Sequence, residues 1–269
     1  CGIYAISLGF YVYQFLFVYV LPKLEIQIWG SEQFWEKIIA VLTILLLSAV
    51  NYIGVKSTSR INKYGAIGAL GVLIAFVVLG FWTAGADITA SKANFDGLFS
   101  RGISGLLAGM GLFYLAFQGS EVAAQSGEEV KNSKDISRGI LIGLFVIIVM
   151  YLVVVFIAIA GTHTDSSAIE SLSKGEGALI TSSLHFRGSE FLFPAILAAG
   201  IVIALIALNA TIYSSSHAFL ALARNQSIPT LLDRISKFGT PVFGIAISAV
   251  LIVVMALALP LHDIAAVAD

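Results

Sequence analysis

The sequence predicts an all-α integral membrane protein, organised as one membrane-embedded domain over residues 1–269. Of the 269 residues, 58% are hydrophobic and 12% are charged. A soluble domain carries about 25% charged residues. The mean hydropathy of +0.96 agrees with this difference. The apolar residues also gather in long runs, and seven of these runs are long enough to cross a bilayer as a helix.

Each predicted span is a run of about 20 mostly apolar residues, the length a helix needs to cross the hydrocarbon core. In order they are Gly2–Leu21, Ile38–Val55, Ile61–Ala84, Gly102–Gln125, Gly139–Ala160, Phe191–Ala223 and Val242–Leu261. Charges occur inside two of them, Lys63 in the third and Glu121 in the fourth. Prolines fall at or near span ends, where a helix tolerates them, at Pro22, Pro194, Pro229 and Pro241.

The basic residues in the connections predict the orientation of the chain. The connections after the second, fourth and sixth spans carry three Lys or Arg each, and the alternating connections carry two each. We therefore expect the richer connections on the cytoplasmic side. The chain opens inside an apolar run without a starting Met, from which we expect a piece of a longer protein. The single cysteine, Cys1, excludes a disulfide framework within the chain, and the net charge of −1 gives no basic surface for nucleic acid.

The longest polar connection, Thr162–Glu190, joins the fifth and sixth spans. Within it, Gly177–Phe186 reads "GALITSSLHF", which predicts a short amphipathic piece on the protein or at the membrane interface. His163 and His185 lie in the same connection, and we expect both at the surface.

The fourth span places a carboxylate where the membrane is most apolar. Arg101 and Lys131 are 30 residues apart. As one continuous helix this length spans about 45 Å, so Glu121 would lie about 15 Å inward from Lys131. A charged side chain at this depth costs at least ~2.5 kcal/mol and normally faces a cavity or a partner. We therefore expect Glu121 to be functional, with a structural, hydrogen-bonded carboxyl group as the alternative.

Gly119 stands between Gln118 and Ser120, directly before Glu121. Glycine weakens a helix, and short polar side chains satisfy backbone groups that unwinding sets free. A break here would leave carbonyl groups facing one way and N–H groups the other, which suits a cation and an anionic ligand group. In the third span, Gly65, Gly68 and Gly71 instead predict close approach of a neighbouring helix.

Three stretches resemble the amino acid–polyamine–organocation permeases. "AFQGSE" followed by "GEEVKN" is similar to their sixth transmembrane segment, with matches at Phe117, Gly119, Glu121, Glu128, Glu129, Lys131 and Asn132. "NYIGVKSTSRIN" (Asn51–Asn62) is similar to the connection between their segments four and five. "ALNATIYSSSHAFLALARNQSIPTLL" with the later Thr240-Pro241 is similar to the end of segment eight and the loop into segment nine. The seven spans then correspond to segments three to nine of the family's twelve.

The resemblance implies part of a fold of two inverted five-helix repeats, in which the first and sixth segments are broken near the midplane. It implies secondary transport of an amino acid or related amine by alternating access, by proton coupling or exchange, without a cofactor other than a coupling proton or sodium ion. The implied substrate-binding residues of the sixth segment are Phe113, Phe117, Gln118, Gly119, Ser120 and Glu121. Phe113 or Phe117 would close over the ligand, and Glu121 would be the protonatable coupling group.

The sequence departs from the family pattern in several places. Ser133 and Ser137 replace prolines, and His217 replaces the usual arginine of segment eight. Some proton-coupled relatives carry a lysine inside segment five, and the corresponding position here is about Ala69. This departure argues against a lysine-based coupling mechanism.

Two further groups of residues are candidates for the site. Tyr4, Tyr11 and Gln14 share one face of the first span, and the two tyrosines are candidate ligand contacts, with packing inside the bundle as the alternative. Thr211, Ser214 and Ser215 are candidate coupling-ion ligands that would complete a sodium site, with bonding between helices as the alternative.

Three other classes of protein compete with a transporter. An intramembrane enzyme needs a nucleophile with a base at membrane depth, and neighbouring Ser120 and Glu121 point about 100° apart on a helix. A channel would need a ring of charged residues or a filter-like repeat, which the sequence lacks. A receptor or assembly subunit that binds amino acids without transporting them stays open. The expected setting is the lipid bilayer of the cell membrane, and the sequence does not indicate the oligomeric state.

Overall fold

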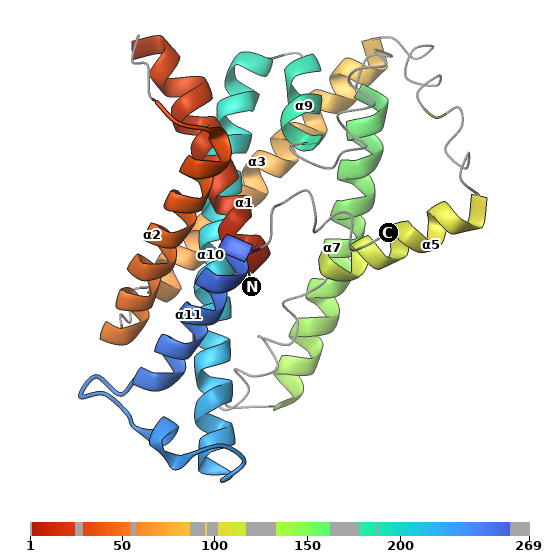
Figure 1. The fold of residues 1–269 in the computed structure, drawn as a ribbon. Coiled ribbons are helices and arrows are strands. Elements are labelled where there is room, and N and C mark those ends of the chain that lie inside the picture. The colour runs from red at the N-terminus through yellow and green to blue at the C-terminus, as the bar shows by residue number, and fades with distance from the viewer. Residues whose placement is uncertain are drawn as a thin grey trace. The chain divides into compact units, whose positions relative to one another are not determined.

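The computed structural model describes residues 2–24, 29–54, 58–86, 95, 102–116, 133–161, 178–186 and 188–258, and these residues are almost entirely helical (Figure 1). The elements are α1 (Gly2–Tyr13), η1 (Gln14–Val20), η2 (Leu21–Leu24), α2 (Glu32–Ile53), α3 (Thr58–Ala86), α5 (Gly102–Ala116), α7 (Ser133–Gly161), α9 (Ala178–His185), α10 (Ser189–Arg224), η4 (Thr230–Asp233) and α11 (Val242–Ala258). In these residues β pairing is limited to one antiparallel bridge between Ile235 and Pro241. The prediction of an all-α fold is confirmed.

The predicted spans coincide with helices. Among the described residues, five helices are long and apolar enough to cross a membrane: Gly2–Leu24, Glu32–Ile53, Asn62–Gly85, Ser137–Ala160 and Ser189–Arg224. The seventh span corresponds to α11, an apolar helix of 17 residues. Of the fourth span, α5 covers Gly102–Ala116, and the rest lies outside the described residues. The amphipathic piece expected at Gly177–Phe186 is α9.

The chain divides into two compact units. Unit 1 comprises Cys1–Gly68 and Gly200–Ile264, and unit 2 comprises Ala69–Ala199 and Ala265–Asp269. The long helices α3 and α10 each begin in one unit and end in the other.

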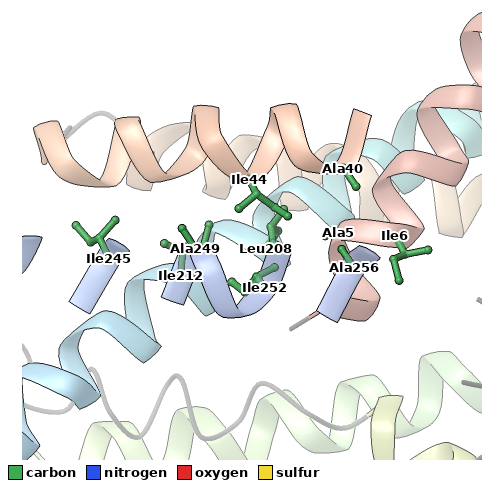
Figure 2. Close-up of a cluster of buried hydrophobic side chains, with 10 residues drawn as sticks. All are labelled: Ala5, Ile6, Ala40, Ile44, Leu208, Ile212, Ile245, Ala249, Ile252 and Ala256. Atoms are coloured by element: carbon green, nitrogen blue, oxygen red, sulfur yellow. The ribbon is translucent and has the colours of Figure 1, made fainter. Parts of the chain in front are cut away.

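The core of unit 1 forms where α1, α2, the second half of α10 and α11 meet. Figure 2 shows its buried side chains, which are Ala5, Ile6, Ala40, Ile44, Leu208, Ile212, Ile245, Ala249, Ile252 and Ala256. Small residues let the helix backbones approach each other closely, which drives helix association in a bilayer. A Cβ atom added at Gly244 of α11 would lie 2.5 Å from the carbonyl oxygen of Ser216 on α10. One added at Gly9 of α1 would overlap the backbone of Glu36 on α2.

Helix α2 has a side-chain cap at one end and a glycine cap at the other. The hydroxyl of Ser31 accepts a hydrogen bond from the Phe34 N–H at 3.4 Å. At the other end, Gly54 adopts φ +69°, and its N–H donates to the carbonyls of Val50 and Asn51 at 3.2 Å. This left-handed conformation favours glycine and ends the helix.

Helices α2 and α11 run antiparallel. Near the start of α2, Lys37 Nζ donates to the carbonyl oxygen of Leu257 at the end of α11, at 3.2 Å. At the opposite ends, Thr240 Oγ1, just before α11, donates to the carbonyl oxygen of Tyr52 near the end of α2, at 2.7 Å. A cation at a helix C-terminus is favourable because the free carbonyls there carry partial negative charge. The antiparallel arrangement agrees with the orientation predicted for the second and seventh spans.

The first span changes its helical form before it ends. After α1 the turns widen to a π-helix over Gln14–Val20 and then tighten to a 3₁₀-helix over Leu21–Leu24. Beside this segment, Gln14 Nε2 donates to Glu32 Oε1 at 3.1 Å, and Lys23 Nζ lies 3.6 Å from the ring centroid of Tyr19. The helical segment therefore extends three residues beyond the predicted end at Leu21.

In unit 2, the chain just after α9 packs onto α3 and α7. The ring of Phe186 is buried, and its centroid lies 4.8 Å from that of Phe76 on α3. A Cβ atom added at Gly80 would overlap Ile157 of α7 and would lie 2.7 Å from Phe186 Cε2. Gly80 is therefore the residue that leaves room for Phe186 between the two long helices.

Candidate functional site

The residues predicted on the sixth family segment fall largely outside the described part of the chain. Phe117, Gln118, Gly119, Ser120 and Glu121 belong to residues 117–132, which are not described. For Phe113 the backbone lies in α5, and its side chain is not described. The helix break at Gly119 and the role of Glu121 therefore stay predictions.

The second half of α10 carries the described hydroxyl groups of the candidate site. Thr211 Oγ1 donates to the carbonyl oxygen of Ala207 at 2.7 Å, and Ser215 Oγ donates to that of Thr211 at the same distance. Ser214 is buried, with 9% of its surface exposed. Side chains of this kind favour bonds to the carbonyl four residues earlier, because those bonds satisfy the hydroxyl proton within the helix.

Ser215 uses its hydroxyl to join two helices. Its Oγ lies 2.8 Å from Ser248 Oγ of α11, a residue with 2% exposure. The two helices touch here because Gly244, one turn before Ser248, lies against the backbone of Ser216. Ser215 is thus engaged both by its own helix and by α11, as the packing alternative predicts.

Thr211 presents its oxygen differently. Its proton is committed to the Ala207 carbonyl, and in the described residues the oxygen has no donor partner. A hydroxyl oxygen has two lone pairs for accepting or coordinating. The role of Thr211 as a coupling-ion ligand stays a prediction.

The two candidate tyrosines of α1 take part in packing. Tyr4 is partly buried against the core of unit 1. The ring of Tyr11 covers Gly200 of α10, where an added Cβ atom would lie 2.5 Å from Tyr11 Cδ1. Gln14, predicted on the same face, donates to Glu32 instead. Whether either tyrosine also contacts a ligand stays a prediction.

His217 is half-buried on α10 and bonded within its own helix. Its Nδ1 lies 2.9 Å from the carbonyl oxygen of Tyr213, and the two ring centroids are 4.1 Å apart. A carbonyl only accepts, so Nδ1 carries the proton in this bond. His217, which replaces the arginine of the family pattern, is therefore held against its own helix.

Residues of the two family-like stretches that the structure describes in part meet near the end of α2. Asn51 Nδ2 donates to Asn209 Oδ1 at 2.8 Å, which joins "NYIG" to "ALNA". Thr240 of the Thr240-Pro241 pair donates to the carbonyl of Tyr52. Gly54 lies against the side chain of Thr240. The spacing of these residues in the sequence does not predict these contacts, because the partners lie on different helices.

None of the described residues groups three or more His, Cys, Asp or Glu side chains in a way that would hold a metal ion.

Comparison with known proteins shows the family. The family profile described as amino acid permease matches residues 1–268, and the chain belongs to this family. It is 28% identical to an uncharacterized transporter of Mycobacterium tuberculosis (strain ATCC 25618 / H37Rv) over 245 residues, which are 90% of this chain and 49% of the relative. The helices and the family together identify an integral membrane protein, as predicted, with the cell membrane as its setting.

Two further relatives are named as a permease and an exchanger of amino acids. The branched-chain amino acid permease BcaP of Lactococcus lactis subsp. cremoris is 25% identical over 245 residues, covering 87% of this chain and 50% of the relative. The serine/threonine exchanger SteT of Bacillus subtilis is 27% identical over 237 residues, covering 85% and 50%. The chain spans about half the length of these relatives.

Proposed function

We propose that the protein to which this chain belongs is a secondary transporter that carries amino acids or related amines across the membrane by alternating access. The observation that carries the proposal is the match to the amino acid permease family over residues 1–268, which includes the predicted break at Gly119. The names of BcaP and SteT, a permease and an exchanger of amino acids, support the same substrate class. In this proposal the protein is a transporter rather than an enzyme, because a permease binds and moves its substrate unchanged.

The substrate is held, in this proposal, by the segment around the break. Free N–H groups beside Gly119 bind the substrate carboxylate, and free carbonyls bind its ammonium group. Gln118 and Ser120 line the same break, and Phe113 or Phe117 closes over the ligand. Tyr4 and Tyr11 of α1 are secondary contacts.

Glu121 is the coupling group. A carboxylate at bilayer depth is costly while it is charged, so proton binding and release change the stability of the states that expose or bury it. A proton gradient, or exchange against a second substrate, then drives uptake. If sodium is used instead, Thr211 and Ser214 are the side-chain ligands on α10.

The experiment is amino acid uptake into proteoliposomes that hold the complete protein, with and without an inward proton gradient. Wild type is compared with Glu121→Gln and with Glu128→Gln, which makes the same chemical change outside the predicted membrane depth. We expect the gradient to stimulate wild type and Glu128→Gln but not Glu121→Gln. Unchanged stimulation of Glu121→Gln would assign Glu121 a structural role and move the coupling group elsewhere.

A non-transporting receptor is the second candidate, because binding and transport use the same pocket. Amino acid binding to the complete protein, without accumulation or exchange under any gradient, would favour the receptor and overturn the transporter.

A further inference from the structure

We propose that the end of α2 and the turn before α11 carry a binding surface for anionic phospholipid headgroups. The surface consists of Tyr52, Arg234, Ile235, Lys237 and Phe238. It goes beyond the proposed transport function and does not depend on it. The connection after α10 is one of the three that the distribution of Lys and Arg predicts on the cytoplasmic side.

The surface is built on a tight turn. The Gly239 N–H donates to the carbonyl of Ser236 at 2.9 Å, and Gly239 adopts φ +83°. Ser236 Oγ accepts from the Phe238 N–H at 3.0 Å, and the Ser236 N–H donates to the carbonyl of Thr240 at 2.8 Å. Lys237 and Phe238 therefore stand at the tip of a turn whose backbone is held by hydrogen bonds.

The turn is attached to the end of α2. Thr240 Oγ1 donates to the Tyr52 carbonyl at 2.7 Å, and the rings of Tyr52 and Phe238 meet edge to face with centroids 6.0 Å apart. A Cβ atom added at Gly54 would lie 3.2 Å from Thr240 Cγ2, so the glycine permits this close approach. The tip is therefore held beside the end of α2, one of the helices long and apolar enough to cross a membrane.

Apolar and basic groups lie side by side on this surface. Phe238 is 49% exposed and Ile235 is 47% exposed, although both are large apolar residues. Lys237 Nζ lies 5.7 Å from the centroid of the Phe238 ring. Aromatic rings beside basic side chains at a helix end are typical of the headgroup zone, where the ring enters the acyl boundary and the cation meets phosphate.

The charge of the connection is uneven. Arg224 Nε lies 3.2 Å from Asp233 Oδ1, and this exposed pair neutralises both groups. Arg234 and Lys237 are exposed and have no acidic partner within the described residues, so their positive charges are not neutralised there. The cytoplasmic leaflet is rich in anionic lipid and attracts basic residues close to its surface. Basic groups fixed beside exposed apolar side chains at a helix end therefore fit a lipid better than a soluble acidic protein.

The test is native mass spectrometry of the complete protein, purified in detergent, delipidated and titrated with phosphatidylglycerol or phosphatidylcholine. Arg234→Gln/Lys237→Gln is compared with Arg224→Gln/Asp233→Asn, which removes charges from the same connection without changing its net charge. We expect the first variant to lose about tenfold in affinity for phosphatidylglycerol, and the second to bind like wild type. Phosphatidylcholine binding should be equal in all three proteins.

Three results would overturn the proposal. One is an unchanged preference for phosphatidylglycerol in Arg234→Gln/Lys237→Gln. A second is displacement of the lipid by millimolar inorganic phosphate, which would show a site for free phosphate. A third is chemical labelling of Arg234 and Lys237 that a soluble protein slows and that phosphatidylglycerol nanodiscs do not slow. The four residues of the two variants are exposed side chains, and equal thermal unfolding of the purified variants checks that folding is unchanged.

Discussion

Asn51 and Asn209 are separated by 158 residues and share a hydrogen bond of 2.8 Å between α2 and α10. Asn51 Nδ2 uses its other hydrogen on the Leu47 carbonyl, also at 2.8 Å, and this bond fixes the orientation of its amide. Asn209 Oδ1 is therefore the acceptor. Only 7% of the surface of Asn209 is exposed. A buried polar pair in a membrane helix bundle is expected to set which faces of the two helices meet.

Breaking this pair from either side should destabilise the protein. Asn51→Leu leaves the buried Asn209 amide without this donor, and Asn209→Leu leaves the half-buried Asn51 amide without this acceptor. We expect each to lose about 1–2 kcal/mol in the free energy of unfolding. The double variant removes both polar groups and should lose less than the sum of the single losses. Unfolding of the complete protein in a denaturing detergent measures all four proteins, and strictly additive losses would contradict the coupling.

Gly244 should not tolerate a side chain. An added Cβ atom would lie 2.5 Å from the Ser216 carbonyl oxygen, so Gly244→Ala must push α11 away from α10. We expect a loss of about 1–3 kcal/mol in the free energy of unfolding. Gly68→Ala is the matched control, because no described atom lies within 4 Å of a Cβ atom there. Equal stability of the two variants would mean that the contact with α10 does not constrain Gly244.

Gly54 is required for its backbone conformation as well as for space. At φ +69° any other L-residue is strained, and a Cβ atom would press on Thr240. Gly54→Ala should lower the free energy of unfolding by about 1–2 kcal/mol. Thr240→Val should lower it by about 1 kcal/mol, because the Tyr52 carbonyl loses its donor. If Gly54→Ala proved neutral in thermal unfolding, α2 would have to end in another way.

The seating of Phe186 depends on Gly80. Gly80→Ala should dislodge the segment after α9, because the added methyl group overlaps Ile157 and crowds the Phe186 ring. Ser183 on α9 is fully buried, so a Ser183→Cys reporter in an otherwise cysteine-free protein measures this change. We expect labelling by a water-soluble maleimide to quicken about tenfold through local opening. Gly85→Ala on the same helix meets no described atom within 4 Å and should leave the rate unchanged.

The hydroxyls of α10 should differ in their effect on any sodium dependence. Thr211→Val keeps the shape of the side chain and removes the oxygen proposed as a cation ligand, so it should abolish any stimulation of uptake by sodium. Ser215→Ala removes a hydroxyl bonded to Ser248 and should cost about 0.6 kcal/mol of stability while leaving sodium stimulation intact. Uptake by the complete protein in sodium and in potassium gradients distinguishes the two. Loss of stimulation in Ser215→Ala alone would reverse the assignment.

The helices were predictable from the sequence because the bilayer acts on each segment separately. A run of apolar residues long enough to span the membrane must satisfy its backbone internally, and a helix does so without any partner. For the same reason α2, α3, α7 and α10 appear where composition predicts them. Their ends were less predictable, since the extension of the first span to Leu24 involves a π-helix that composition does not indicate.

The meaning of individual small and polar residues was harder to predict. Three glycines of the third span predicted close approach, and it is found at Gly65, where an added Cβ atom would lie 2.9 Å from Val202 Cγ1. At Gly68 and Gly71 no described atom lies within 4 Å of such a Cβ. Thr211 and Ser215 look alike in sequence, and only Ser215 is bonded to α11.

By itself, the sequence determined that the chain is helical and membrane-embedded, and its motifs pointed to the amino acid permease family. Only the tertiary structure decided that Asn51 bonds to Asn209, that Ser215 bonds to Ser248, and that Gly54 lies against Thr240. The physical reason is that burial in lipid depends on the composition of one segment, whereas a partner depends on how two helices are rotated and crossed. That geometry results from all the contacts of a helix together, and no single segment encodes it.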